Sequence, residues 1–312
     1  MNGWIKGAIA ASVVGASFPV SGALTDYSYT AGQFIRYAIG ALILVVICKG
    51  RVGKPTLKEL ALLNATAAVG MVGFNLAVLA AVDHIGATNA GVIIGASPVF
   101  LALATGHRQV LPAALVVVAG AAIVNGADST VTVLGALLAI AALVGEVGFT
   151  LLAAPLLPRL GPTRVAAWTA ILATAQLGLL TGGDLPTPTG THVAAILYLA
   201  VITTAFAFVL WFSAVQQLGS GRAGLLVGFM PIAAVATDAL LNGRAPSTAD
   251  LAGTALVALG IAIGASPERA RAVVLRGGTR AASAAASAGT SSTCPAASSS
   301  PAGAPPAPAS RR

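Results

Sequence analysis

The residue with the clearest chemical potential is Glu146, which lies within an otherwise apolar stretch of the chain. It follows Val133, the first residue of that stretch, by thirteen positions, which is about 20 Å along a helix. A glutamate side chain is too short to reach water from that depth. Because apolar surroundings favour the neutral carboxyl, the group can take up and release a proton during a transport cycle. The alternative is a protonated glutamate that hydrogen-bonds a neighbouring helix and serves stability.

A second candidate is Arg36, which lies five residues past Ala31 and so about 7–8 Å below the end of its apolar stretch. Its guanidinium can bind a substrate carboxylate through two parallel hydrogen bonds, or pair with Glu146. A long arginine side chain can equally carry its charge out to water from this depth. The residue types favour neither interpretation over the other.

Four neutral residues complete the candidates for a substrate pathway. Asn75, Thr203 and Thr204 offer hydrogen bonds in a region without water, and Trp211 lies too deep for an aromatic belt at the membrane interface. Each of them either lines a polar cavity or bonds an adjacent helix. Three scattered histidines and two cysteines give no usual ligand spacing, so we expect neither a metal nor another cofactor.

Composition identifies the elements that must hold these residues. Of the 312 residues, 57% are hydrophobic and 8% are charged, whereas soluble domains carry about 25% charged residues. This excludes a soluble enzyme, because such a chain cannot cover its surface with polar groups. The sequence predicts an all-α polytopic membrane protein with ten transmembrane helices. The ten apolar windows are 5–24, 31–48, 60–82, 87–105, 111–127, 133–153, 165–182, 191–215, 222–241 and 249–265.

Basic residues are distributed unevenly over this topology. Ten spans place both termini on one side, and that side receives 15 of the 17 lysines and arginines. Positive residues mark the cytoplasmic side, so we expect a plasma-membrane protein with both termini cytoplasmic. The net charge of +8 follows from this asymmetry and from attraction to the lipid bilayer, and no nucleic-acid partner is expected. Residues 266–312, rich in Ala, Ser, Pro and Arg, are expected to form a disordered cytoplasmic tail.

The halves of the membrane region resemble each other at an offset of 133 residues. Each half contains five predicted spans, an odd number, so the second copy must enter the membrane in the opposite orientation. Inverted repeats are typical of alternating-access transporters, whose substrate site lies near the midplane. We predict one repeat over 1–130 and a second over 131–265. The matched residues are Gly86 and Gly219, Ala90 and Ala223, Gly91 and Gly224, Gly95 and Gly228, and Pro98 and Pro231.

The matched prolines lie in mid-span, each three residues after a glycine. Pro98 and Pro231 each remove an amide hydrogen and loosen one helical turn within the membrane. The predicted role is either a hinge or cavity wall, or a packing kink without mechanical function.

Several short motifs follow one another in an order that is typical of a known family. They are Phe34-Ile35-Arg36-Tyr37 in the first half, and Thr204-Ala205, Trp211-Phe212, Leu218-Gly219 and Met230-Pro231 in the second. In this order the chain resembles the EamA-type family of the drug/metabolite transporter superfamily over residues 5–265. The resemblance implies two five-helix repeats and export of amino acids or related small metabolites, by a secondary or facilitated route without bound nucleotide. The chain departs from the family pattern at Met230, where relatives often have glutamate, so the resemblance does not specify a substrate.

Two other classes of function are compatible with a polytopic membrane protein. A membrane-embedded transferase needs an acidic pair for a metal-diphosphate, or a buried histidine with a partner, and no predicted span holds either. A non-transporting assembly partner needs a structured domain outside the membrane, whereas the long extramembrane segment here is the predicted tail. The sequence therefore predicts a transporter of a small-molecule substrate. A homodimer is compatible with the glycine-rich stretch 86–91, which permits close helix packing within or between chains.

Overall fold

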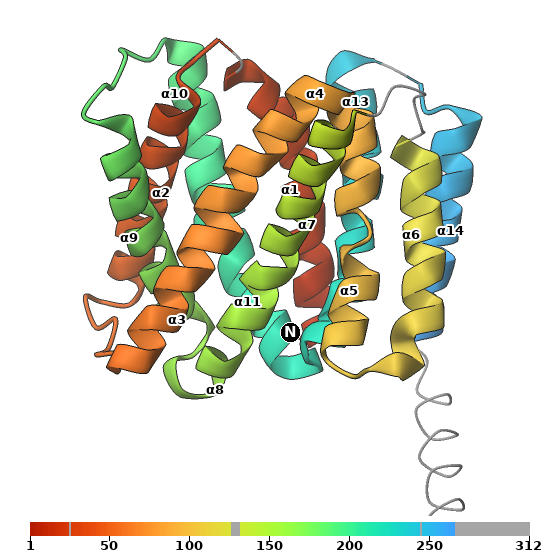
Figure 1. Ribbon diagram of the computed structural model, residues 1–312, viewed down its shortest axis with the longest axis horizontal. Helices are drawn as coiled ribbons and strands as arrows, with labels where there is room; N and C mark the ends of the chain where they lie inside the picture. Colours follow the sequence, from red (N-terminus) through yellow and green to blue (C-terminus); the bar gives the residue numbers. More distant parts are fainter. Residues whose placement is uncertain (25, 126–131, 244, 266–312) are drawn as a thin grey trace, which may run out of the picture. The chain divides into compact units, whose positions relative to one another are not determined.

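Helices form all the regular secondary structure in the part of the chain that the structure describes. The computed structural model describes residues 1–24, 26–125, 132–243 and 245–265, which belong to one unit, Met1–Ser266. Figure 1 shows these helices running largely side by side. The predicted all-α fold is confirmed. The predicted tail over 266–312 lies outside the described residues.

The described residues of each predicted window coincide with one helix or with consecutive helices. The α-helices are α1 (Gly3–Ser21), α2 (Tyr29–Ile47), α3 (Leu57–Ala67), α4 (Phe74–Ile94), α5 (Ser97–Ala104), α6 (Leu111–Asn125), α7 (Val133–Ala153), α8 (Leu157–Leu160), α9 (Pro162–Thr181), α10 (Gly190–Tyr198), α11 (Ala207–Leu218), α12 (Ser220–Gly224), α13 (Phe229–Asn242) and α14 (Thr248–Ala265). Short 3₁₀ turns are η1 (Gly22–Leu24), η3 (Arg108–Val110), η4 (Ala154–Leu156) and η6 (Leu225–Gly228), and π-helical segments are η2 (Ala68–Gly73) and η5 (Leu199–Phe206).

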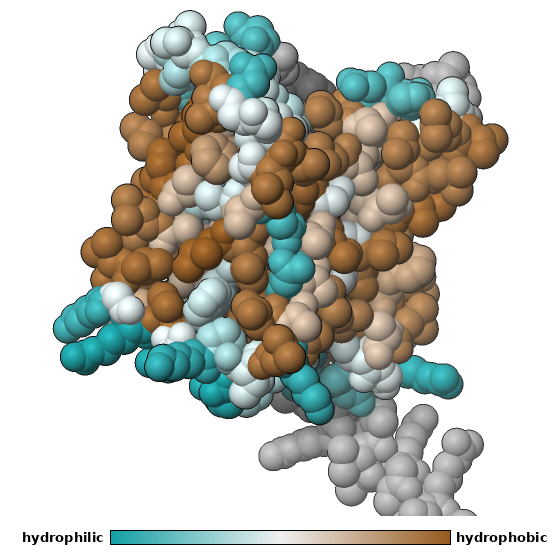
Figure 2. Space-filling model, turned by 60° about the vertical axis from the view of Figure 1, so that its left-hand side comes forward, coloured by the Kyte–Doolittle hydropathy of each residue, from teal (hydrophilic) through white to brown (hydrophobic). Residues whose placement is uncertain are grey.

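Six helical segments within the described residues are long and apolar enough to cross a membrane. Two shorter apolar helices cover Asn89–Ala104 and Arg108–Val124. Figure 2 shows a broad apolar band with hydrophilic residues gathered above and below it. The protein is therefore a multi-pass membrane protein. The six segments are Tyr29–Ile47, Leu57–Gly86, Val133–Leu160, Gly190–Leu218, Ser220–Thr237 and Thr248–Ala265.

Five helix pairings hold the unit together. Helix α2 packs on α9, and α6 packs on α14 at the opposite end of Figure 1. Between them, α1 packs on α11 and α13, and α7 packs on α4. The α6–α14 contact is especially close at Gly120 and Gly253. A Cβ atom at Gly120 would lie 2.7 Å from the Gly253 carbonyl oxygen, and a Cβ atom at Gly253 would lie 2.6 Å from that of Gly120. Glycine is thus required at both positions for this backbone contact.

Three glycines interrupt the helical backbone with nearly the same geometry, and one of them is Gly161, between α8 and α9, with φ 79° and ψ 158°. Gly86, within α4, has φ 75° and ψ 160°, and Gly219, between α11 and α12, has φ 78° and ψ 156°. Glycine alone reaches this region without appreciable strain. Gly86 and Gly219 are the first matched pair at the 133-residue offset, whereas Gly161 lies over Ser28 at that offset.

The π-helical segments are also placed alike. Segment η2 connects α3 to α4, and η5 connects α10 to α11. An offset of 133 places Ala68, the first residue of η2, over Val201 in η5. Short π-helical segments occur frequently at functional sites.

Pro98 and Pro231 each lie in the first turn of a helix. Pro98 is the second residue of α5, which begins after α4 ends at Ile94, and Pro231 is the third residue of α13, which follows η6. A proline in a first turn sacrifices no intrahelical hydrogen bond. The predicted interruption of the helix is thus found immediately before each proline, and not at the proline itself.

Candidate substrate site

Arg36 is buried between α2 and η5. Arg36 is only 9% exposed. Its charge therefore does not reach water, which excludes the predicted alternative in which the long side chain extends out of the membrane. Its Nε atom donates to Thr204 Oγ1 at 2.9 Å and its Nη1 atom to Gln33 Oε1 at 3.2 Å. Gly40 lies one turn further along α2, where a Cβ atom would lie 2.7 Å from Thr204 Cγ2. The small residue at this position therefore lets η5 approach α2.

Asn75, near the start of α4, extends the polar contacts of α2. Its amide nitrogen donates to the Tyr37 hydroxyl at 3.0 Å and to the Met71 carbonyl at 2.6 Å. The Tyr29 hydroxyl donates to the Asn75 carbonyl oxygen at 3.0 Å. The structure therefore brings three predicted residues, Arg36, Asn75 and Thr204, into one region. We call Tyr29, Gln33, Arg36, Tyr37, Asn75 and Thr204 the polar cluster.

Sequence reasoning did not identify Tyr29 or Gln33 as part of this group. A signal was nevertheless present in their spacing. Positions 29, 33 and 36 are separated by four and three residues, which places them on one face of a helix. The three polar side chains of α2 could thus have been assigned together.

Two buried hydroxyl groups have no hydrogen-bond partner within the described residues. They are Thr203 Oγ1, in a residue 3% exposed, and Ser97 Oγ at the start of α5. Thr203 is adjacent to Thr204, which binds Arg36. Leaving a buried polar group unpaired costs about 1–3 kcal/mol. Such a group is usually paired with water or a ligand when the protein works.

Arg36 also lacks an anionic partner in the described part of the chain. The ion pairs there are Arg159 with Glu59 and His192 with Asp26. The pair between Arg36 and Glu146 that the sequence suggested is not formed, although both residues are described. An uncompensated buried charge is costly, so the site favours an anion beside Arg36. No group of three or more His, Cys, Asp or Glu in the described residues could hold a metal ion.

Glu146 lies on the inward face of α7. The residues one helical turn before and after it, Ala142, Leu143, Phe149 and Thr150, are all buried, whereas Glu146 itself is partly exposed. Glu146 thus keeps some accessible surface on an otherwise buried face of α7. The structure places α7 from Val133 as predicted, so Glu146 lies well within its helix.

Trp211 connects α11 to α7 close to Glu146. The Trp211 indole Nε1 donates to Thr150 Oγ1 at 3.2 Å, and both residues are buried. Thr150 lies one turn after Glu146 on α7. Five predicted site residues are therefore found in two places, the polar cluster and the group formed by Glu146, Thr150 and Trp211. Thr203, next to Thr204 in the chain, belongs to neither group.

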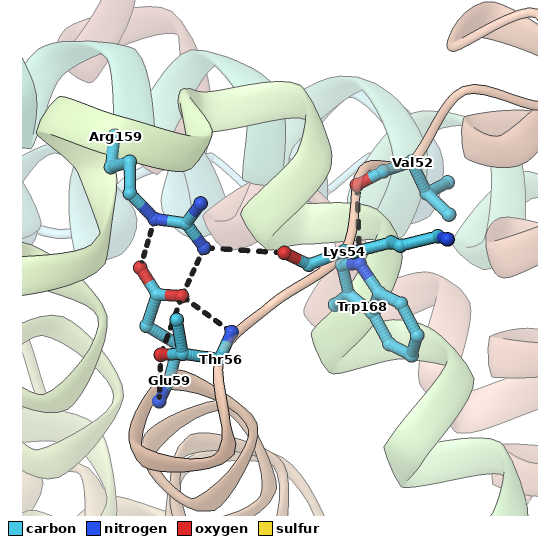
Figure 3. Close-up of polar contacts among 6 residues, drawn as sticks. All are labelled: Val52, Lys54, Thr56, Glu59, Arg159 and Trp168. Carbon is cyan, nitrogen blue, oxygen red and sulfur yellow. Dashed lines mark hydrogen bonds and ion pairs between the residues drawn. The ribbon is translucent and has the colours of Figure 1, made fainter.

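The loop between α2 and α3 is fixed by contacts with α8 and α9, which Figure 3 shows. Arg159 forms an ion pair with Glu59, and Glu59 also accepts a hydrogen bond from the Thr56 backbone at 2.7 Å. The Thr56 side chain completes a capping box at the start of α3. The Trp168 indole donates to the Val52 carbonyl at 3.2 Å. These contacts hold the loop in place.

A second anchored segment precedes α2. Asp26 Oδ1 lies 3.0 Å from His192 Nε2 on α10, and the Tyr27 hydroxyl donates to the Pro186 carbonyl at 2.7 Å. The hydrogen bond with His192 lowers the pKa of the Asp26 carboxyl. This contact connects the start of α2 to the start of α10.

Apolar helices long enough to cross a membrane, with buried polar groups between them, define a multi-pass membrane protein. The sequence matches the EamA-like transporter family over residues 1–107 and 133–264. The chain belongs to this family and hence to the drug/metabolite transporter superfamily, as the motifs predicted. It is a transporter of small molecules and not an enzyme, so the transferase alternative is excluded.

Similar proteins agree with this assignment. The chain is 25% identical over 258 residues to a Bacillus subtilis (strain 168) protein described as "Uncharacterized transporter YetK", with 75% of this chain and 78% of the relative covered. A protein of known crystal structure superposes with a TM-score of 0.74 at 18% identity, over 84% of this chain and 96% of that one. The second comparison shows a shared fold.

Proposed function

We propose that the protein is a secondary or facilitated exporter of amino acids or related small metabolites that carry a carboxylate. The observation that carries this proposal is the buried guanidinium of Arg36, which has no carboxylate partner in the described residues. A substrate carboxylate can accept two hydrogen bonds from a guanidinium and neutralise its charge. The unpaired Thr203 hydroxyl supports a ligand on the same segment.

Alternating access is the second part of the proposal. We assign ten transmembrane spans to two inverted repeats, over 1–130 and 131–265. Three observations at the 133-residue offset support this assignment: the matching backbone of Gly86 and Gly219, the matching π-helical segments, and the contact between Gly120 and Gly253. The two separate stretches that match the family agree with it.

Pro98 and Pro231 are proposed as hinge positions within these repeats. Each follows an interruption of the helix, where backbone dihedral angles can change without breaking a regular hydrogen-bond ladder. Glu146 is proposed to couple transport to protons, because it is an ionisable residue on the buried face of an apolar helix. From the distribution of basic residues, we further propose a plasma-membrane protein with both termini cytoplasmic.

Counterflow in proteoliposomes tests the carboxylate site. The vesicles would be loaded with pooled amino acids and with the amines that correspond to them without the carboxylate. We expect uptake of the carboxylates, and a loss of apparent affinity of about 10- to 150-fold in Arg36→Gln, because a hydrogen bond to a charged group contributes about 1.5–3 kcal/mol. Arg36→Lys should retain part of the uptake. Exposed Arg108 supplies the control, Arg108→Gln, which should transport as the wild type does.

Two results would argue against this assignment. One is equal uptake by Arg36→Gln and the wild type, and the other is a preference for the amines. Imposed pH gradients of either sign then test Glu146. Uptake that follows the gradient, and loses this dependence in Glu146→Gln, would establish proton coupling. Uptake that ignores both the gradient and the substitution would make the protein a facilitator with a structural glutamate.

A further inference from the structure

A cavity of about 270 Å³ lies where α2 ends and α9 begins, and no residue of the polar cluster lines it. Ile47 and Cys48 line it from the end of α2, and Arg51 lines it from the following loop. Thr163 and Arg164, in the first turn of α9, line the opposite side. The cavity is thus separate from the proposed substrate site.

The polar lining of this cavity is basic. Arg51 and Arg164 both line it, no acidic residue does, and neither arginine forms an ion pair within the described residues. Gly53 lies beside Arg164, where a Cβ atom would lie 3.7 Å from Arg164 Cδ. Two guanidinium groups that face one space favour a phosphate, whose oxygens accept their paired hydrogen bonds.

The backbone adds donors to the same side. Helix α9 follows Gly161, which offers no side-chain cap, and its first residue is Pro162. The N–H groups of Thr163 and Arg164 therefore have no partner within the helix, and they lie at its positive end. This supplements the two arginines in favouring an anion.

The apolar lining indicates where that anion comes from. Ile47 lines the cavity and is 58% exposed. Leu42 and Val46, one helical turn apart on α2, are also mostly exposed and lead towards the cavity along one side of the helix. In a membrane protein, exposed aliphatic side chains contact acyl chains. A phosphate held beside Ile47 could therefore be attached to a lipid whose tails follow α2.

We propose that this cavity binds the phosphodiester headgroup of an anionic phospholipid. Arg51 and Arg164 hold the phosphate, and the acyl chains lie along Leu42 and Val46. The lipid contacts both α2 and α9, two helices that pack on each other, so its binding stabilises that pairing. Because α2 carries Arg36 and other residues of the polar cluster, the bound lipid also stabilises the position of the helix on which they lie.

Cys48 serves as the reporter because it lines the same cavity. The chain has two cysteines, so Cys294→Ser leaves Cys48 as the single thiol. The rate of maleimide labelling would be measured in neutral detergent with dihexanoyl phosphatidylglycerol, and in parallel with dihexanoyl phosphatidylcholine or inorganic phosphate at equal concentration. At about ten times its Kd, the bound lipid leaves roughly one site in eleven empty, so labelling should slow about tenfold. We expect this protection from phosphatidylglycerol alone.

Substitutions decide whether the arginines are responsible. Arg51→Gln combined with Arg164→Gln should abolish protection, whereas the same change to lysine should retain part of it. Lys54→Gln with Lys58→Gln removes two exposed charges from the neighbouring segment, which do not line the cavity, and should leave protection unchanged. Native mass spectrometry of the delipidated protein provides a second readout, with more bound phosphatidylglycerol than phosphatidylcholine expected.

Three results would overturn the proposal. Equal protection by phosphatidylcholine would remove the preference for an anionic lipid. Equal protection by inorganic phosphate would identify a free anion site. Protection that persists in the double glutamine variant would show that the arginines do not form the site.

Discussion

The contact between Gly120 and Gly253 makes a quantitative prediction about the α6–α14 pairing. In Gly120→Ala, the new methyl carbon would lie 2.7 Å from the Gly253 carbonyl oxygen and 2.7 Å from the Val257 backbone nitrogen. Ordinary contacts begin at 3.4 Å, so the helices would have to separate by roughly 0.7 Å. Both obstructing atoms belong to the backbone and cannot rotate away.

The expected loss of stability combines two effects. Overpacking a well-packed contact costs about 1–3 kcal/mol, and replacing glycine by alanine within a helix returns about 0.5–1 kcal/mol. These ranges combine to a loss of about 0–2.5 kcal/mol. Because both obstructing atoms are backbone atoms, Gly120→Ala should lie towards the upper end, which is a decrease of several degrees in melting temperature for a domain of this size. Gly253→Ala should behave in the same way. The double variant should lose less than the sum of the two, because one separation of the helices relieves both clashes.

The assay is thermal unfolding in detergent, followed by size-exclusion chromatography. Gly190→Ala is the matched control, because no atom lies within 4 Å of a Cβ placed there, and its melting temperature should not fall. An unchanged melting temperature in Gly120→Ala would refute the close contact. Strict additivity in the double variant would show that the two glycines do not face each other.

Three further predictions concern contacts away from this pairing. The hydrogen bond with His192 lowers the pKa of Asp26, so this contact stabilises the fold fully above the ordinary carboxyl pKa, and the stabilisation is lost as the pH falls through the lowered pKa. In melting curves recorded at several pH values, Asp26→Asn should melt at a lower temperature than the wild type at neutral pH. At the most acidic pH the two should melt at the same temperature. Thr150→Val should lower the free energy of unfolding by about 1–3 kcal/mol, because it leaves the Trp211 indole N–H without an acceptor, and Thr150→Ser should restore most of it in the same denaturation assay. Gly219→Ala should cost about 1–3 kcal/mol from backbone strain alone, since no atom lies within 4 Å of its Cβ position, and a melting temperature equal to that of the wild type would contradict the positive φ angle.

The helix positions could be predicted because the membrane imposes a simple rule. In the membrane, the backbone N–H and C=O groups of each span must be hydrogen-bonded within that span. Long apolar stretches therefore form helices, whichever helices they pack against. Helix α7 accordingly begins at the predicted Val133. The same apolar composition conceals η2 and η5, since the residues of a π-helical segment do not differ in type from those of the α-helices around it. Gly86 and Gly219 were recognised as a matched pair, but a sequence match does not report a φ angle.

The sequence predicted several residues of the candidate site, but it did not predict which of them are in contact. Arg36 and Thr204 lie 168 residues apart, and their hydrogen bond depends on which faces of α2 and η5 meet. One sequence does not contain that information, which is why pairing with Glu146 was equally reasonable. Tyr29 and Gln33 could have been found from helical spacing to Arg36. The contact between Asp26 and His192 could not have been found from the sequence, because only tertiary packing brings these two distant residues together.

The π-helical segments also determine where the chain can change length. Deleting one residue from an α-helix turns every later side chain by about 100°, which would move the residues beyond it off their packing faces. A π-helical turn contains more residues than an α-helical turn, because its hydrogen bonds close five residues apart in place of four. Removing one residue within Leu199–Phe206 can convert that segment to α-helix while α10 and α11 keep their faces. The same holds for Ala68–Gly73, so these two segments are the places where related sequences can gain or lose a residue inside a membrane helix without losing the fold.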